Sequence, residues 1–351
     1  MHVHELIDAL TPEFAAAYAN QSERPEVKRF SSLKDWRREF KKVSKDSVVF
    51  THVRPINLQS ALICLKIHLS GSKVVGFSIG GAPNYASVGD LKESKSIKIL
   101  KSLFHLVKRR LFSFIAPKIV LVGGTEEEKR ARRDFLQRVT LVLGNSSDYS
   151  QRLIRSQNMQ TDVAESLFLD TGFPGFLRDE LLAGETESVL PSQWYPRLAL
   201  FFDFVYQTFG YATVIAIHPK HVGRDHSAFF GPRRAIGGQT LDLVSSSELV
   251  IATNSTSISY AVAFRKPLLL VTCDAIESSK QRKRLEIRNC ALETGARIFN
   301  IDREYTEQEL REALVIDHAK RESYKRKYLT SRTDDKPNYQ VLLDEVINAV
   351  E

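Results

Sequence analysis

A series of short apolar runs, each closed by glycine or by a small polar residue, limits the fold of this chain more than any other feature of its sequence. The runs are residues 47–52, 73–79, 118–122, 139–143, 165–169, 212–217, 248–252, 267–272 and 297–301. Helix-like stretches such as residues 58–69 and 193–209 separate them. Strands that alternate with helices form parallel βαβ units, and the polar residues after the strands gather at the carboxyl edge of the sheet. The sequence therefore predicts an α/β protein that binds its ligands at that edge.

The strand candidates fall into two groups, which predicts two domains. A chain of 351 residues is long enough to bury two hydrophobic cores. We expect an N-terminal Rossmann-like domain over residues 1–158 and a C-terminal Rossmann-like domain over residues 159–335. A final helix within residues 336–351 is expected to cross back to the first domain. The predicted fold class is α/β, with two Rossmann-like domains facing each other across a cleft.

The net charge of the chain favours anionic partners. Lysine and arginine number 50 against 42 aspartate and glutamate residues, which gives a formal charge of +8 and a pI near 9.3. Residues 95–118 hold basic side chains between apolar ones and no acidic residue. Such a stretch is either an amphipathic helix on an anionic membrane or a core helix with a basic outer face. No helix-turn-helix or zinc-finger pattern is present, so nucleic acid is not an expected partner.

The sequence predicts a cytoplasmic protein without a metal or a resident cofactor. Cys64, Cys273 and Cys290 are odd in number and lack zinc-ligand spacing, which argues against a disulfide framework and a structural zinc site. The first residues are polar and acidic, unlike a secretory signal peptide, and no apolar run is long enough to span a membrane. P-loop and GxGxxG signatures are also missing.

Polar residues after the strands of the second domain form a candidate anion site. An imidazole and an ammonium group follow one strand and can contact phosphate. A run of hydroxyl and amide side chains follows another strand and precedes an apolar helix, whose first backbone N–H groups attract anions. Each feature alone also fits an ordinary strand end or helix cap, but both converge on one crevice, where Arg233 and Arg234 add positive charge. The predicted nucleotide-binding residues are His218, Pro219, Lys220, Thr171, Gly172, Gly237, Gly238, Thr253, Asn254, Ser255, Thr256 and Ser257.

Three residues are candidates for catalysis: His218, His52 and Asp170. Asp170 follows a strand and can act as a base, orient a donor hydroxyl or cap the next turn. His52 ends the first strand and is the first candidate for a base that activates an acceptor hydroxyl. The candidate acceptor-side residues, which follow the first two strands, are Arg54, Asn57, Gly80, Gly81, Asn84 and Tyr85.

The second half of the chain resembles the donor-nucleotide domain of GT-B glycosyltransferases. The resemblance covers residues 165–275 and rests on IHPKH at 217–221 and on NSTS at 254–257. These motifs are similar to the HP and S motifs of bacterial sialyltransferases, polysialyltransferases and Kdo transferases, which use CMP-sugars. The resemblance implies that His218, Ser255, Thr256 and Ser257 contact the CMP phosphate. The acidic pair followed by glycine that supplies the base in several sialyltransferases has no match in the first half, so the base stays unassigned.

The resemblance implies a metal-independent glycosyltransferase of surface polysaccharide biosynthesis, for capsule or lipopolysaccharide. Its donor is expected to be a CMP-linked sugar of the sialic acid or Kdo type, and its acceptor a glycan or a lipid-linked molecule. A CDP-alditol phosphotransferase and a nucleotide-sugar epimerase on the same scaffold remain open alternatives. So does a non-enzymatic, membrane-associated binding protein. Residues 95–118 predict a peripheral position at the inner face of an anionic membrane.

Overall fold

In the computed structural model the chain forms two compact units. The first unit comprises residues 1–79 and 93–144, and the second comprises residues 80–92 and 145–351. Within these units the structure describes residues 3–5, 27–53, 58–80, 83, 114–134, 139–155, 165–174, 189–218, 225–279 and 281–347.

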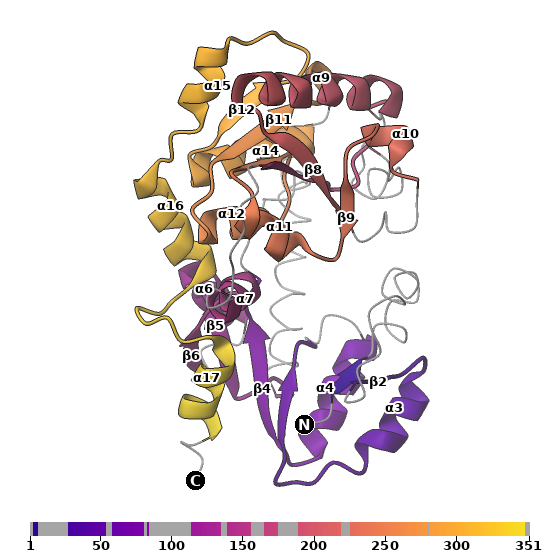
Figure 1. Cartoon of the computed structure of the whole chain (residues 1–351). Helices are drawn as coiled ribbons and strands as arrows, with labels where there is room; N and C mark the ends of the chain where they lie inside the picture. The colour runs from indigo at the N-terminus through magenta and orange to yellow at the C-terminus, as the bar shows by residue number, and fades with distance from the viewer. Residues whose placement is uncertain are drawn as a thin grey trace, which may run out of the picture. The chain divides into compact units, whose positions relative to one another are not determined.

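The second unit is built on a six-stranded parallel sheet. The strands are β7 (Glu165–Leu169), β8 (Ala212–Ile217), β9 (Ala235–Gly237), β10 (Leu249–Ala252), β11 (Leu268–Thr272) and β12 (Arg297–Asn300). Their order in the sheet is β12-β11-β10-β7-β8-β9. Figure 1 labels β12, β11, β8 and β9 of this sheet. Counted from the first strand of the unit, this is the doubly wound order 3-2-1-4-5-6, in which the chain direction along the sheet reverses between β7 and β10. Ligands of such sheets bind outside the carboxyl ends of the strands at this switch point.

The central strands of this sheet are almost continuously apolar because helices cover both faces. All the described residues of β10 and β11 are buried. The longest of the described helices, α9 (Pro191–Phe209), buries Trp194, Leu198 and Phe202 against the sheet, starts with proline at its first turn and ends at Gly210 with φ 74°. The other helices and helical turns are α7 (Ser147–Arg155), α10 (Ser227–Phe230), α11 (Thr240–Ser246), α12 (Ile258–Ala263), α13 (Asp274–Ser279), α14 (Gln281–Thr294), α15 (Glu307–Ala313), α16 (His318–Tyr324), η3 (Lys325–Leu329), α17 (Asn338–Leu342) and η4 (Leu343–Ile347).

The first unit holds a smaller parallel sheet in the order β3-β4-β5-β6. Its strands are β3 (Val48–Thr51), β4 (Lys73–Ser78), β5 (Ile119–Gly123) and β6 (Thr140–Gly144), and a separate parallel pair is formed by β1 (Val3–Glu5) and β2 (Val27–Arg29). Helices α3 (Leu33–Phe40), α4 (Leu58–Leu69) and α6 (Thr125–Asp134) belong to this unit. Trp36, Phe40, Ile63 and Ile67 pack together where α3 and α4 meet.

The expected α/β class with two parallel sheets is confirmed, and each predicted strand is a strand in the structure. The pair β1 and β2 and the edge strand β9 have three residues each and were not expected. The sequence-based boundary after residue 158 assigns α7 to the first domain, whereas the structure groups α7 with the second unit. The reason is packing, because Tyr149 and Leu153 of α7 are buried with Val262, Tyr324 and Leu329.

The chain end also belongs to the second unit. Asn338, at the start of α17, accepts a hydrogen bond from the backbone of Asn145 at 2.8 Å, and its own backbone N–H donates to Ser150 at 2.9 Å. The helix expected to return to the first domain thus contacts residues around the start of α7. It begins directly after Pro337.

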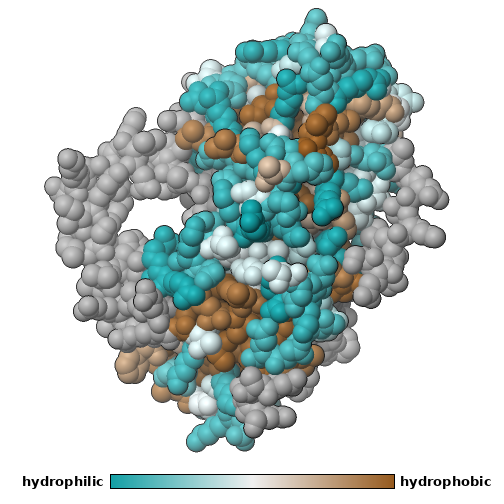
Figure 2. Space-filling view, turned by 90° about the vertical axis from the view of Figure 1, so that its left-hand side faces the viewer, coloured by the Kyte–Doolittle hydropathy of each residue, from teal (hydrophilic) through white to brown (hydrophobic). Residues whose placement is uncertain are grey.

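None of the described helices is long and apolar enough to cross a membrane. On the face shown in Figure 2 most of the described surface is hydrophilic, and hydrophobic residues gather in patches between hydrophilic ones. The basic stretch at residues 95–118 lies outside the described residues up to residue 113.

Candidate functional site

The carboxyl ends of β7 and β8 are joined by the carboxylate of Asp170. Asp170 follows β7 and is 5% exposed. Its Oδ1 accepts the backbone N–H of Gly172 at 2.8 Å, and its Oδ2 accepts the backbone N–H of His218 at 3.3 Å. Two backbone donors on one buried carboxylate fix the loop after β7 and the first residue after β8 relative to each other.

A second chain of hydrogen bonds crosses the switch point between β7 and β10. The hydroxyls of Thr171 and Thr253 are 3.3 Å apart, and Thr253 donates to Asn254 Oδ1 at 3.1 Å. Asn254 donates from Nδ2 to Glu286 Oε2 at 2.5 Å. Thr253 is 1% exposed, so its hydroxyl is held by these partners and not by solvent. The loop after β7 and the loop after β10 therefore meet at the switch point.

The turn between β10 and α12 leaves its first backbone N–H groups outside the helix. The backbone bonds of the turn are donated by Ile258, Ser259 and Tyr260, which lie after these groups. Ser255 Oγ accepts the N–H of Ser257 at 3.2 Å, an arrangement that leaves the hydroxyl proton of Ser255 to donate elsewhere. Ser255 and Ser257 are half-buried and Thr256 is exposed. Hydroxyl and backbone donors thus follow β10 directly.

His218 lies next to the end of β9 as well as next to the Asp170 loop. Ile217, which precedes His218, pairs with Gly237, the last residue of β9. Gly238 has φ 74°, a conformation that other residues rarely adopt, and a side chain there would meet nothing within 4 Å. Pro219 and Lys220 lie outside the described residues. The half-buried His218 therefore sits between the Asp170 loop and the two glycines along this edge.

Helix α14 contributes two side chains that the sequence analysis did not name. Glu286 is 13% exposed and binds Arg282 Nε at 2.9 Å in addition to Asn254. The ammonium group of Lys283 lies 4.7 Å from the centre of the Phe173 ring, in the loop after β7. The basic run QRKR at residues 281–284 was the available signal, because it follows β11, the neighbour of β10. The sequence alone does not show which side chains of that helix reach the edge of the sheet, because this depends on how the helix packs.

Arg233 and Arg234 do not belong to this site, contrary to the sequence-based interpretation. Both precede β9 and so lie at the amino end of that strand. Arg233 pairs with Asp203 at 2.5 Å and stacks 5.3 Å from the centre of the Phe202 ring. Arg234 binds both oxygens of Glu165 at 2.9 and 3.1 Å. Arg233 is thus paired with a carboxylate of α9, and Arg234 with one at the amino end of β7.

In the first unit the structure describes only part of the predicted acceptor side. His52 follows β3, is exposed, and stacks on Phe77 with ring centres 4.5 Å apart. Gly80 follows β4, is exposed, and is grouped with the second unit. The remaining candidates lie outside the described residues: Arg54, Asn57, Gly81, Asn84 and Tyr85.

The cysteines and the acidic side chains offer little to a metal or to thiol chemistry in the part of the chain that is described. Cys64, Cys273 and Cys290 are buried thiols. Burial raises the pKa of Cys64 and of Cys273 to about 11, so neither is a thiolate at neutral pH. No group of three or more His, Cys, Asp or Glu side chains that could hold a metal ion occurs among the described residues.

Solved structures of low sequence identity share the fold of this chain. A protein described as a UDP-N-acetylglucosamine 2-epimerase from Listeria monocytogenes matches with a TM-score of 0.51 and 11% identity, over 98% of this chain and 87% of that one. The wall teichoic acid polymerase TagF matches with a TM-score of 0.50 and 12% identity, over 97% and 85%. This is the GT-B fold. No protein family profile matches the sequence, and no curated protein matches it either.

The GT-B fold of the chain is what these similarities establish, because both identities are far below 25%. Neither of these two solved structures is a sialyltransferase or a Kdo transferase. The narrower resemblance to CMP-sugar enzymes stays a prediction from the HP and S motifs of the sequence.

Proposed function

We propose that this protein is a glycosyltransferase that uses a nucleotide-activated sugar, with a CMP-linked sugar as the preferred donor. The observation that carries the proposal is the set of hydrogen bonds at the switch point of the six-stranded sheet. Asp170 fixes the backbone at Gly172 and His218, and Thr171 meets Thr253 across β7 and β10. This is the edge at which doubly wound sheets bind nucleotides.

The polar groups at this edge suit the charge that develops when a nucleotide leaves. Transfer from a CMP-sugar breaks the bond between the sugar and a phosphate oxygen, so negative charge grows on the phosphate in the transition state. The hydroxyl of Ser255 and the backbone N–H groups before α12 can donate to those oxygens. His218 can donate from its imidazole, and Lys220, two residues later in the sequence, is predicted to add a positive charge. We assign Asp170 a positioning role, since its oxygens are used by backbone donors.

The acceptor hydroxyl needs a base, and we assign this role to His52 of the first unit. His52 is an exposed imidazole that follows β3, and the unprotonated nitrogen of a neutral imidazole can accept a proton from a hydroxyl group. The acceptor is proposed to be a glycan or a lipid-linked molecule of surface polysaccharide synthesis.

Two other donor chemistries use the same kind of scaffold and are decided by experiment. The two solved structures named above are described as an epimerase of UDP-N-acetylglucosamine and a teichoic acid polymerase. A nucleotide-sugar epimerase would convert its donor without any acceptor. A CDP-alditol phosphotransferase would keep the phosphate on the transferred group and release CMP from a CDP-linked donor.

The direct test is transfer from labelled CMP-sialic acid and CMP-Kdo, compared with CDP-glycerol and UDP-N-acetylglucosamine. We expect His218→Ala and Ser255→Ala each to lower transfer at least a hundredfold while the protein stays folded. The matched controls are His68→Ala and Ser278→Ala, which remove an exposed imidazole and an exposed hydroxyl elsewhere and should retain activity. Full activity of either site variant would rule out this site. Turnover of only the UDP-linked donor would rule out the CMP preference.

We also propose that the first unit docks on an anionic membrane, as one face of α4 suggests. Leu58, Leu62, Leu65 and Leu69 lie on that face at helical spacing, and Leu58 and Leu69 are 76% and 70% exposed. Lys66 in the last turn adds positive charge. Sedimentation with phosphatidylglycerol vesicles should be lost in Leu58→Ser/Leu69→Ser and kept in Leu200→Ser. Equal binding by the wild type, Leu58→Ser/Leu69→Ser and Leu200→Ser would contradict the assignment.

A further inference from the structure

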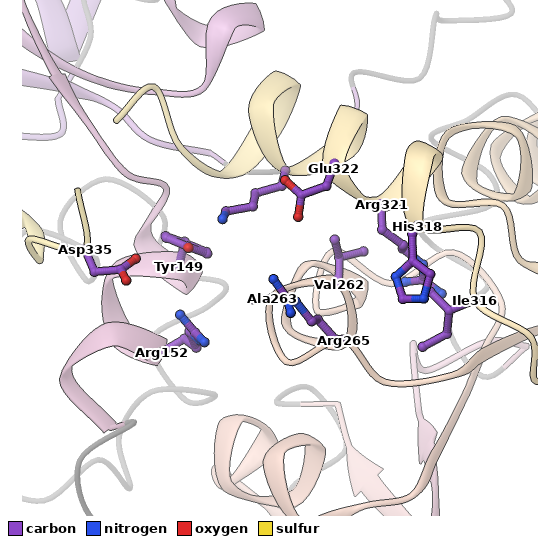
Figure 3. A pocket seen from close by; sticks show the side chains of 11 residues that line it. Tyr149, Arg152, Val262, Ala263, Arg265, Ile316, His318, Arg321, Glu322 and Asp335 are labelled. Carbon is purple, nitrogen blue, oxygen red and sulfur yellow. The ribbon is translucent and has the colours of Figure 1, made fainter. Parts of the chain in front are cut away.

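A cavity of about 300 Å³ lies in the second unit, away from the switch point. It is lined by Val262 and Ala263 at the end of α12, whereas the donor groups described above precede the start of that helix. Figure 3 shows Arg152 and Arg265 on one side of this cavity and Glu322 on the opposite side. We call it the basic pocket, because its lining also includes Arg321 and Lys325.

Arg321 of α16 is the feature that calls for a ligand. The residue is 6% exposed, and its Nε and Nη1 are buried without a hydrogen-bond partner among the described residues. Burial lowers the pKa of Arg321 to about 10, which still leaves the guanidinium charged at neutral pH. A buried charge without partners is strongly unfavourable, so native proteins pair such groups or bind counter-ions with them.

Two other side chains that line the basic pocket, Arg152 and Lys325, add positive charge. The Lys325 ammonium group lies 5.3 Å and the Arg152 guanidinium 5.6 Å from the centre of the Tyr149 ring. Arg152 Nε is also buried without a hydrogen-bond partner. The carboxylates of the lining, Glu322 and Asp335, belong to exposed residues. The buried part of the pocket is therefore cationic, and its acidic groups lie at the surface.

Arg265 contributes a fourth cation from a conformation that arginine rarely adopts. It has φ 55°, the only positive φ of a non-glycine residue in the described part of the chain. Glycine is the usual residue at such a position after a helix end. The backbone strain supplies no ligand by itself, but it makes Arg265 a useful probe, since glycine would relax the backbone and remove the guanidinium together.

We propose that the basic pocket binds the phosphate group of a small phosphorylated ligand, as a second anion site separate from the nucleotide site. Guanidinium groups match phosphate oxygens in pairs, which would give Arg321 and Arg152 the partners that they lack. The Tyr149 ring and the side chains of Val262 and Ile316 provide apolar surface for the rest of such a ligand. A carboxylate would fill fewer of these donors than a phosphate does.

The experiment is calorimetric titration of the full chain with inorganic phosphate and with pyrophosphate, at constant ionic strength. Arg321→Met should weaken phosphate binding at least tenfold, and Arg265→Gly at least threefold. The matched control is Arg326→Met, which removes an exposed arginine from the same helical turn as Lys325. Thr253→Val serves as the nucleotide-site variant and should leave this phosphate binding unchanged.

Several results would overturn the proposal. One is phosphate binding that is lost in Thr253→Val and kept in Arg321→Met, because the anion would then sit at the switch point. Another is equal weakening in Arg326→Met, because the effect would then reflect net charge alone. If Arg321→Met fails to fold, Arg265→Gly decides the question, since relaxing the backbone should preserve folding while binding falls. The site would also be rejected if Arg265→Gly and Arg321→Met both bound phosphate as tightly as the wild type does.

Discussion

The switch-point site and the basic pocket use polar groups in opposite ways. At the switch point the polar side chains have hydrogen-bond partners within the protein. Asp170 accepts backbone N–H groups, and a second chain of bonds runs from Thr171 to Glu286. These side chains therefore stabilise the folded protein even without a ligand. In the basic pocket, Arg321 is as buried as Asp170 but has guanidinium atoms without partners. The first site is organised before a ligand arrives, whereas the second is stabilised by one. Removing a charged group should therefore have opposite effects on folding in the two places.

Asp170→Ala should have the largest effect, because it leaves two backbone N–H groups without their acceptor. We expect the free energy of unfolding to fall by about 3 kcal/mol, from two hydrogen bonds to a buried charged group. Urea denaturation followed by fluorescence measures the change. Asp46→Ala, which removes an exposed carboxylate, is the control. A loss as small as that of the control would show that Asp170 does not hold these loops.

Arg321→Met should change stability in the other direction. Replacing a buried guanidinium whose Nε and Nη1 lack hydrogen-bond partners by an apolar side chain of similar length should raise the free energy of unfolding by about 1 kcal/mol without phosphate. Thermal unfolding of the two proteins in phosphate-free buffer measures this. Marked destabilisation of the variant would mean that Arg321 is already paired in the folded protein, and the contrast with Asp170 would fail.

Asp148 should make the stability of the second unit depend on pH. It links α7 to α12, and these helices contribute to the two sites. Its carboxylate accepts a hydrogen bond from Ser259, and burial raises its pKa above the ordinary value of 3.8. The folded protein then keeps a proton that the unfolded chain releases, so this group lowers stability as pH rises above about 4. Asp148→Asn cannot ionise. The melting temperature of Asp148→Asn minus that of the wild type should therefore increase from pH 4 to pH 7. A difference that does not change with pH would contradict the assignment.

Arg234→Ala should have the smallest effect. The ion pair with Glu165 leaves Arg234 60% exposed, and exposed pairs of this kind contribute less than about 1 kcal/mol. Because Arg234 lies at the opposite edge of the sheet, the affinity for CMP should not change. Titration with CMP checks this. A tenfold loss of affinity in Arg234→Ala would show that Arg234 belongs to the nucleotide site after all.

The sequence predicted the edge of the sheet well and the basic pocket not at all. Strand runs such as residues 212–217 and the polar residues after them are local, so parallel pairing brings Asp170, His218 and Thr253 together once the strand order is known. The basic pocket draws its residues from α7, α12, α16 and η3, and no local pattern links these elements. Glu286 was missed for the same reason. Strand β9 was missed because its three residues, AIG, carry too little periodicity.

The central claim is that the edge between β7 and β10 binds the donor nucleotide, and titration with CMP tests it most directly. We predict that CMP binds the wild type and Ser278→Ala equally, and that Thr253→Val binds at least tenfold more weakly, a loss of about 1.4 kcal/mol. Thr253→Val keeps the shape of a residue that is 1% exposed and removes only its hydroxyl from the bonds with Thr171 and Asn254. CMP binding by Thr253→Val as tight as that of the wild type would contradict the claim.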